Sequence, residues 1–280
     1  IQDCGGTLKT ISKGAEFAAP MARNLSDQAR VEFDISRLIM AMECGGSDPT
    51  SGLASNPAIG FAADKLVGLG GSAILSETTE VIGAEHLIAE RFEDPVQRAR
   101  FLSQVKNVEE RAIRLGEDLR SGQPTPGNKA GGLSTIEEKS LGCMYKAGSS
   151  PFKSALDYAQ RLPDKLHGMV FMDTPGQDID SITGMVAGGA QVVVFSTGRG
   201  TPTGCPIAPV IKITGNPDTY EKMPDNLDLS AGGVISRGQT IPEVGKALFD
   251  LMIQVCNGHQ TKSESLGHRE FGIYKLAGTF

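Results

Sequence analysis

The sequence predicts an α/β protein with a mainly parallel, Rossmann-like sheet in three layers, in which helices cover both faces. Two observations indicate this class. Short, almost continuous apolar runs recur along the chain, and such runs are typical of strands that are buried on both faces. The runs alternate with longer segments of helical periodicity. Alternation of this kind needs crossover connections, which join parallel strands.

The expected strands are apolar runs that end in turns. The run QVVVF is the strongest of them, because it is dense in β-branched and aromatic residues. A further edge strand is expected at the end of the tail 267–280, and the first six residues resemble the last turn of a strand followed by a glycine bend. The main runs span 38–42, 72–75, 168–172, 191–195 and 210–214.

The expected helices have apolar residues at spacings of three and four. Pro57 stands at the first position of one helix, and the sequence STIEE from Ser134 forms a capping-box start for another. Prolines and glycines bar regular structure from 121–133, which is an expected loop or linker. The helices span 7–24, 56–69, 81–92, 101–119, 134–148, 154–161, 179–188 and 242–257.

The length of 280 residues is enough for one large core or two modest ones. We expect a single α/β domain over residues 1–280, with a helical excursion at about 80–165. The chain begins with Ile rather than Met. We therefore expect it to be a piece of a longer protein.

Composition disfavours several classes of partner. The net charge of −6 and the isoelectric point of 5.3 disfavour nucleic acid. No apolar run approaches the roughly 18 residues that a membrane span needs, so we expect no membrane contact. Five cysteines without metal-finger spacing disfavour a disulfide framework and indicate a reducing, cytoplasmic location. An anionic substrate would need a local cation to overcome the negative net charge.

The run 38–42 leads directly into a carboxylate, a thiol, two glycines and a hydroxyl. Glu43, Cys44, Ser47 and Asp48 therefore follow a buried strand and precede a helix. In open α/β sheets, ligands bind in the crevice beyond the carboxyl ends of the strands, so these side chains stand where a functional site is expected. The alternative interpretation is a tight turn with a buried cysteine and an aspartate that caps the helix.

Two more strands end in carboxylates at the same expected edge. Glu77 and Glu80 follow the run 72–75, and Asp173 follows the run 168–172. The alternative for the two glutamates is that they only suit the positive end of a helix that Ser76 or Thr79 caps.

The strand 191–195 opens into a glycine-rich loop with one long cation, Arg199. Gly198 and Gly200 nearly imitate a dinucleotide fingerprint, but the spacing differs and a strand follows where that motif needs a helix. We therefore expect Arg199 and the backbone amides around it to bind a carboxylate. The alternative is that Arg199 only ties neighbouring loops together.

Several blocks of the sequence, in this order, resemble a known family. They are ECGGSDPTSG with NPAIG, ETTEVIGAEH, PGNKAGGLSTIEEKSLG, FSTGRGTP and NGHQTKSESLGHREF. The chain resembles, over nearly its whole length, the C-terminal catalytic region of the altronate and galactarate dehydratases, whose family includes the large subunit of sulfolactate sulfo-lyase. The DCGG at Asp3 departs from the family pattern, so we assign no role to Asp3 or Cys4.

The resemblance implies a divalent-metal-dependent lyase that is usually activated by Fe²⁺, with Mn²⁺ or Mg²⁺ as alternatives. It also implies an upstream segment with a His and Cys motif, and in some members a small amino-terminal domain. The expected partners are a small anionic hydroxy acid, the upstream segment or a small subunit of the same enzyme, and further copies of the chain in a homo-oligomer.

The chemistry of such enzymes starts with removal of a proton beside a carboxylate. A divalent ion and a positioned Arg or Lys can stabilise the enolate-like dianion that results. If hydroxide then departs as water, the enzyme is a hydro-lyase that converts a sugar acid such as altronate or galactarate into a 2-keto-3-deoxy acid. If sulfite departs, it is a sulfolactate sulfo-lyase. A third possibility is a non-catalytic binding or assembly domain of a larger enzyme.

We expect the hydro-lyase, with roles divided among nine residues, of which all but Lys139 follow expected strands. The catalytic candidates are Glu43, Cys44 and Lys139, the metal ligands are Asp48 and Glu80, and the substrate is bound by Arg199, Gly198, Gly200 and Ser47.

Overall fold

The structure is a computed structural model that describes residues 1–274. The chain divides into two compact units, Ile1–Asp34 and the much larger unit that begins at Ile35. The first unit consists mainly of helix α1, Thr7–Ser26, which confirms the expected helix and has no buried residues. The strand turn expected in the first six residues is wrong, because backbone bonds from Gly5 to Gln2 and from Gly6 to Ile1 close tight turns there.

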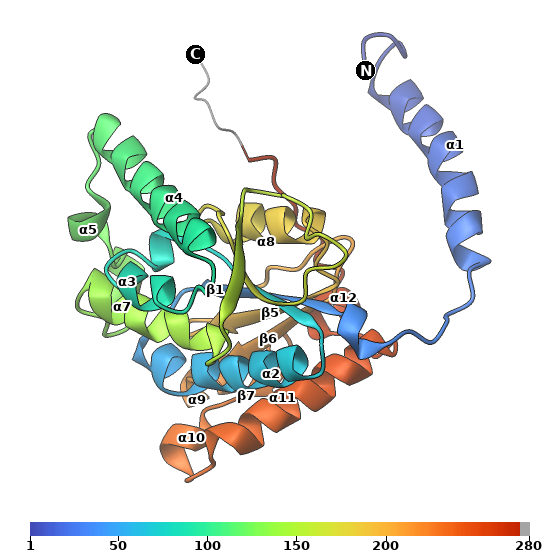
Figure 1. The fold of residues 1–280 in the computed structure, drawn as a ribbon. Helices are drawn as coiled ribbons and strands as arrows, with labels where there is room; N and C mark the ends of the chain where they lie inside the picture. The colour runs from blue at the N-terminus through green and yellow to red at the C-terminus, as the bar shows by residue number, and fades with distance from the viewer. Residues whose placement is uncertain (275–280) are drawn as a thin grey trace. The chain divides into compact units, whose positions relative to one another are not determined.

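The second unit is built on a seven-stranded sheet in the order β3-β4-β2-β1-β5-β6-β7, with every neighbouring pair parallel. Figure 1 shows this sheet between layers of helices, which confirms the predicted fold class. All five main predicted strands are present. The strands are β1 Ile39–Gly45, β2 Ser72–Leu75, β3 Phe152–Leu156, β4 Gly168–Met172, β5 Val192–Thr197, β6 Val210–Thr214 and β7 Leu229–Ser230.

Three local predictions differ from the structure. The helix expected at 154–161 is wrong, because β3 pairs with β4 there and Phe152 stacks on Phe92 at 5.1 Å between ring centroids. Pairing along the sheet thus overrides the helical pattern. The two residues of β7 are too few to give a periodic signal. The tail holds no strand between 267 and 274, and the rest of the expected edge strand lies outside the described residues.

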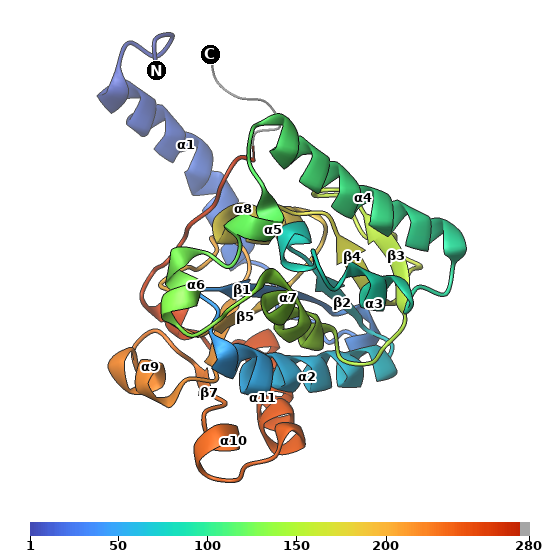
Figure 2. The ribbon, with the colours of Figure 1, turned by 90° about the vertical axis from the view of Figure 1, so that its left-hand side faces the viewer.

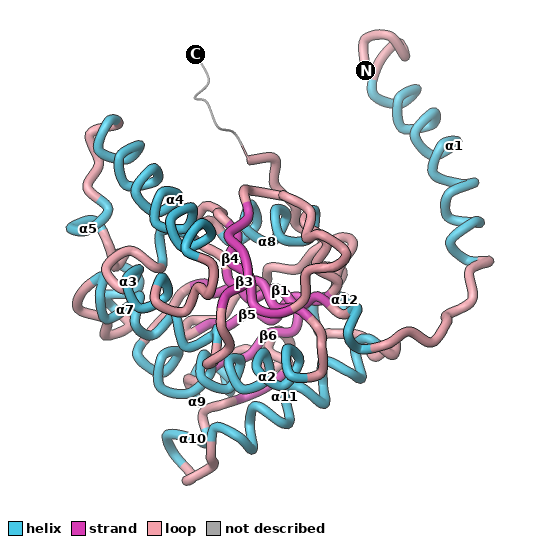
Figure 3. Tube along the Cα trace, in the orientation of Figure 1, coloured by secondary structure: helices cyan, strands magenta, loops and turns pink. Residues whose placement is uncertain are grey.

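Helices cover both faces of the sheet, as Figures 2 and 3 show. Helix α8 lies on one face, while α2 and α11 pack against each other on the other face. These three helices begin and end close to their predicted limits. They span Asn56–Gly68 for α2, Asp178–Ala187 for α8 and Ile241–Cys256 for α11.

The remaining helices are shorter or displaced relative to prediction. The helix expected at 81–92 is reduced to α3, because Gly83 adopts a positive φ of 96° and interrupts it. The expected loop at 121–133 contains two short helices, α5 and α6. Asp94 caps α4, which therefore starts earlier than expected. These helices are α3 Glu85–Ala89, α4 Pro95–Arg114, α5 Leu119–Gly122, α6 Pro126–Ala130, α7 Ile136–Met144, α9 Pro217–Lys222, α10 Gly233–Ser236 and α12 Lys262–Ser265.

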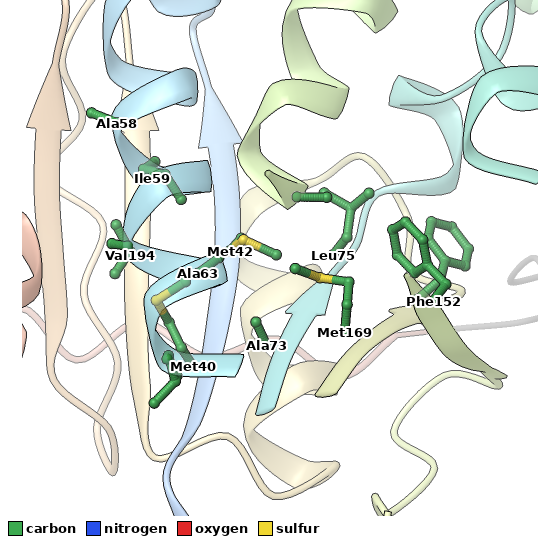
Figure 4. Packing of buried hydrophobic residues seen from close by; sticks show 14 of the residues in the cluster. Met40, Met42, Ala58, Ile59, Ala63, Ala73, Leu75, Phe152, Met169 and Val194 are labelled. Atoms are coloured by element: carbon green, nitrogen blue, oxygen red, sulfur yellow. The ribbon is translucent and has the colours of Figure 1, made fainter. Parts of the chain in front are cut away.

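The core lies mainly between the sheet and the layer that contains α2. Met40 and Met42 of β1 belong to the same buried cluster as Ile59 and Ala63 of α2 (Figure 4). Ala41, between the two methionines, belongs to the separate cluster on the side of α8. Successive residues of β1 therefore face opposite layers, as the two-residue period of a strand requires.

No helix in residues 1–274 combines the length and apolarity that a membrane crossing requires.

Candidate active site and metal ligands

The candidate site lies beyond the carboxyl ends of β1 and β5. Within the sheet, β2 is the neighbour of β1 along one edge and β5 is its neighbour along the other edge. The order of the strands thus changes direction between β1 and β5, which is where open α/β sheets bind ligands. Arg199 donates its backbone amide to Gly46 at 3.1 Å, so the loops that carry Glu43 and Arg199 meet at one edge, as predicted.

The alternation of β1 sends Glu43 and Cys44 to opposite sides of the sheet. Cys44 continues the row of Met40 and Met42 and faces α7, whereas Glu43 continues the row of Ala41 and faces α8. Two separate groups of potential metal ligands result, one on each side.

The first group consists of Cys44, Glu80 and Cys143, which are all buried. Each offers one ligand atom, and these atoms lie within 4.8 Å of one another. The Cys44 thiol donates to a Glu80 oxygen, and its sulfur lies 3.9 Å from that of Cys143. The other Glu80 oxygen accepts an ion pair from Lys139 at 2.9 Å. We call these three ligands the thiol set.

Neighbouring charges and burial determine the protonation states of the thiol set and of Lys139. Burial alone would raise the pKa of Glu80, but the ammonium groups of Lys139 and Lys146 lower it to about 2. A hydrogen bond with Cys143 and burial raise the pKa of the Cys44 thiol well above its ordinary value. Burial would lower the pKa of Lys139, but Glu80 raises it overall. Glu80 and Lys139 are therefore ionised near neutral pH, while Cys44 is a thiol.

A pocket of about 230 Å³ opens beside the thiol set. Cys143 and Lys139 line it together with the exposed side chains of Leu53 and Tyr145. Asn56 also lines it. Its amide nitrogen donates to Gly142 at 2.8 Å, while its buried oxygen has no hydrogen-bond partner among the described residues. The pocket is therefore bordered by a residue with a thiol and a residue with an ammonium group.

The second group consists of Glu43, Glu77 and Asp178, which we call the carboxylate set. One ligand atom from each lies within 4.8 Å of the others. Glu43 accepts a hydrogen bond from Ser181 at 2.6 Å, and one oxygen of Glu77 accepts from Lys146 at 3.3 Å. The other oxygen of Glu43 and the other oxygen of Glu77 are buried without a partner among the described residues.

Burial and the charge of neighbouring carboxylates raise the pKa of every member of the carboxylate set. Burial and the charge of Glu77 raise the pKa of Glu43 well above its ordinary value. Burial and Glu80 raise the pKa of Glu77 to about 7, and Lys146 opposes that increase. Burial and Glu80 also raise the pKa of Asp178 to about 6. In the absence of a cation, this set therefore holds its negative charge unfavourably.

The backbone is adapted to bring the carboxylates together. Glu77 has φ of 68° and ψ of 76°, in the left-handed region that residues other than glycine rarely adopt and that often marks functional sites. A Cβ atom on Gly45 would lie 2.6 Å from a carboxylate oxygen of Asp178. Only glycine at this position lets Asp178 approach β1 so closely.

The structure does not place the expected metal ligand Asp48 in either set. Its carboxylate accepts hydrogen bonds from the Ser51 backbone at 3.1 Å and from Asn216 at 2.9 Å, and also from Thr50. The bond from Ser51 gives Asp48 the capping role of the alternative interpretation, and the bond from Asn216 adds a contact with a distant loop. Ser47 lines the pocket, and its carbonyl oxygen accepts a hydrogen bond from the Asn128 side chain at 2.9 Å.

Arg199 is exposed, and its guanidinium has no hydrogen bond or ion pair with any residue in the described part of the chain. The guanidinium lies against Gly127, where a Cβ atom would meet it. Gly198 packs on Asp48, and Gly200 has a positive φ of 84° that suits the turn. The glycines therefore shape the loop, and Arg199 remains available for an anion.

Sequence reasoning missed three members of this site. Cys143 and Lys146 lie on α7 and the turn after it, and no strand end marked them. Asp178 begins α8 after the Pro-Gly loop in which only Asp173 was considered. Their partners are distant along the chain, so local sequence patterns did not indicate them.

Comparison with known proteins gives the family. Residues 35–279 match the family described as D-galactarate/Altronate dehydratase, C-terminal. The chain is 36% identical to (2R)-sulfolactate sulfo-lyase subunit beta of Chromohalobacter salexigens over 97% of its own length and 70% of that protein. It is 34% identical to altronate dehydratase of Escherichia coli over 96% of its own length and 53% of that protein. It is 37% identical to galactarate dehydratase (L-threo-forming) of Escherichia coli over 94% of its own length and 50% of that protein.

The chain thus spans about half the length of the two dehydratases and 70% of the sulfo-lyase subunit. The family match covers both ligand sets, the pocket and Arg199. This chain belongs to the D-galactarate/altronate dehydratase family, of which it carries the C-terminal domain.

Proposed function

We propose that this chain carries the catalytic region of a metal-dependent hydro-lyase that dehydrates a sugar acid, such as altronate or galactarate, to a 2-keto-3-deoxy acid. One observation carries the proposal. Cys143 of the thiol set and Lys139 line a pocket at the carboxyl edge of the sheet, where its strand order changes direction. The site thus combines potential metal ligands with a fixed positive charge beside a space for a small molecule.

The residues of the thiol set fit a ferrous ion. Two thiols and one carboxylate form a mixed sulfur and oxygen donor set, which suits Fe²⁺ better than Mg²⁺ or Mn²⁺, because those ions prefer oxygen alone. Cys44 and Cys143 would lose their protons on binding. A bound ion would act as a Lewis acid on the carboxylate and hydroxyl of the substrate.

Lys139 suits the stabilisation of negative charge rather than proton abstraction. Glu80 raises the pKa of Lys139 despite the opposing effect of burial, so its side chain stays an ammonium group. An ammonium group beside the pocket favours the enolate-like charge that develops after a proton is removed next to a carboxylate. Glu43, which was expected to be catalytic, lies on the other side of the sheet and does not line the pocket.

Arg199 supports the binding of an anionic substrate. Its exposed guanidinium forms no hydrogen bond or ion pair with the described residues. It can therefore form two parallel hydrogen bonds to one carboxylate. Gly198 and Gly200 let the loop that carries Arg199 pack closely against Asp48 and Met223.

A second candidate function is sulfite release from sulfolactate. It is favoured by the similarity to the (2R)-sulfolactate sulfo-lyase subunit, of which this chain covers 70%, against 53% and 50% of the two dehydratases. Both functions share the first chemical step. The proposal also includes a cytoplasmic location, a homo-oligomer and an upstream segment or small subunit that completes the enzyme. If that segment holds the whole active site, this chain is a non-catalytic assembly domain.

The full-length enzyme should be assayed anaerobically with Fe²⁺ on altronate, galactarate and sulfolactate, with 2-keto acid and sulfite as the measured products. We expect 2-keto acid from one of the sugar acids. Cys143→Ser should abolish that activity, whereas Cys205→Ser, a change outside both ligand sets, should retain it. Sulfite from sulfolactate alone would establish the second function. Full activity of Cys143→Ser would show that the thiol set is not catalytic.

A further inference from the structure

We propose that the carboxylate set, Glu43, Glu77 and Asp178, is a second cation site. It takes a hard divalent ion, such as Mn²⁺, Mg²⁺ or Ca²⁺, with oxygen ligands alone. This site is separate from the thiol set, because Glu43 and Cys44 project to opposite sides of β1. The inference does not depend on the reaction that the enzyme catalyses.

Two buried oxygens indicate that a ligand is required. One oxygen of Glu43 and one of Glu77 have no hydrogen-bond partner among the described residues, although both side chains are completely buried. A buried carboxylate oxygen without a partner is strongly unfavourable, and native proteins rarely leave one. The other oxygens of these two residues are held by Ser181 and by Lys146, so their carboxyl groups are fixed in orientation.

The spacing of the set suits an ion with oxygen ligands. Ligand atoms from the three carboxyl groups lie within 4.8 Å of one another. Calcium binds oxygens at about 2.3 to 2.6 Å, so two oxygens on opposite sides of one ion lie up to about 5 Å apart. One ion can therefore contact all three groups without a large movement of the backbone.

Charge balance also favours a divalent ion. Lys139 is paired with Glu80 and Lys146 with Glu77. Glu43 and Asp178 have no ion-pair partner within the described residues, so together they leave two negative charges when ionised. A divalent cation neutralises those two charges. In the competing state, Glu43 and Asp178 each bind a proton and no cation is bound.

The local backbone is shaped for the same purpose. Gly45 leaves the space that the carboxylate of Asp178 fills, and Glu77 adopts a left-handed conformation that directs its side chain into the set. The ion would join the carboxyl ends of β1 and β2 to the first turn of α8. It would thus brace the edge of the sheet on which the candidate active site lies.

The test uses the metal-stripped 280-residue chain and two probe ions. Cd²⁺ binds thiolates and gives a cadmium-thiolate absorbance, whereas Mn²⁺ prefers oxygen and its binding can be followed by electron paramagnetic resonance. We expect the wild-type chain to bind one equivalent of each ion at the same time. A Cd²⁺-saturated chain that takes up no Mn²⁺ would overturn the proposal without any variant.

Variants assign each ion to its set. Asp178→Asn should weaken Mn²⁺ binding at least about tenfold and retain the cadmium-thiolate absorbance. Cys143→Ser should do the reverse, and Asp180→Asn, on the same helix but outside the set, should change neither. Glu43→Gln provides a second removal of a ligand if Asp178→Asn folds poorly. Unchanged Mn²⁺ binding in both ligand variants would show that the carboxylates are neutralised by protons.

Discussion

Asp178→Asn should stabilise the metal-free chain near neutral pH, although it removes a carboxylate that would bind the proposed cation. Burial and the charge of Glu80 raise the pKa of Asp178 from 3.8 to about 6. A raised pKa means that the folded chain holds the ionised carboxylate less favourably than the unfolded chain does. Asparagine has nearly the same shape and no charge, so the substitution removes this penalty.

The pKa change sets the size of the effect. The difference between 3.8 and about 6 corresponds to at most about 3 kcal/mol in the free energy of unfolding. An aspartate in the first turn of α8 also interacts favourably with the helix dipole, by about 0.3 to 1 kcal/mol, and the variant loses that interaction. We therefore expect a net gain of about 1 to 2 kcal/mol near pH 8, which is roughly 2 to 8 °C in Tm.

The gain should depend on pH with a definite sign. Between pH 3.8 and about 6 the folded wild-type chain binds more protons at Asp178 than the unfolded chain, so its stability falls as pH rises through this window. The advantage of Asp178→Asn should therefore be absent at the acidic end of the window, about half developed near pH 5 and complete above about pH 7.

Urea unfolding followed by circular dichroism, in EDTA at about pH 5 and about pH 8, measures both quantities. Asp180→Asn is the matched control, because it removes a carboxylate from the same turn of α8 without touching the carboxylate set. The reasoning is refuted if Asp178→Asn lowers stability near pH 8, or if its gain is the same at both pH values.

Three further substitutions test the packing and the chemistry. Gly60→Ala should lower the free energy of unfolding by about 1 to 3 kcal/mol, because its Cβ atom would meet the backbone of the turn after α7; Gly68→Ala, in open space on the same helix, is the control in urea unfolding. Lys146→Met should destabilise by about 3 to 5 kcal/mol at pH 8, since it leaves Glu77 buried and unpaired, and a smaller loss would show that Glu77 is already neutral. Arg199→Lys should leave Tm unchanged and lower kcat/KM of the full-length enzyme by about ten to a few hundredfold; loss of Tm with unchanged kcat/KM would make the residue structural.

The parallel sheet was predictable because its central strands are short apolar runs that end in glycine and carboxylate residues. Met40 to Met42 and Val192 to Phe195 contain no polar residue that could face solvent, so only a doubly covered sheet accommodates them. The strand β3 was missed because it contains Lys153 and Ser154 and lies at the edge of the sheet. Its pairing with β4 depends on the stack of Phe152 on Phe92, which joins separate parts of the chain.

The site was predictable only in part, for a physical reason. Glu43 and Cys44 lie in the last residues of β1 and Glu80 lies in the turn that follows β2, and the carboxyl ends of parallel strands share one edge. Cys143 comes from α7, whose position over Cys44 depends on the packing of α2 against the turn after α7. Asp48 was wrongly expected to bind metal, because it follows a strand as a ligand would, whereas its oxygens accept hydrogen bonds from the nearby Ser51 and the distant Asn216.

The two ligand sets lie on opposite faces of the sheet because successive side chains of β1 point in opposite directions. The charges of one set nevertheless affect the pKa values of the other. One oxygen of Glu77, in the carboxylate set, accepts the backbone amide of Cys44 at 2.9 Å and the ammonium group of Lys146 at 3.3 Å. Glu77 contributes to the raised pKa of Cys44, and Lys146 contributes to the lowered pKa of Glu80. A cation bound by the carboxylate set would screen Glu77, so deprotonation of Cys44 would become easier. The oxygen ligands on one side of β1 can thus favour the thiolate that a metal needs on the other side.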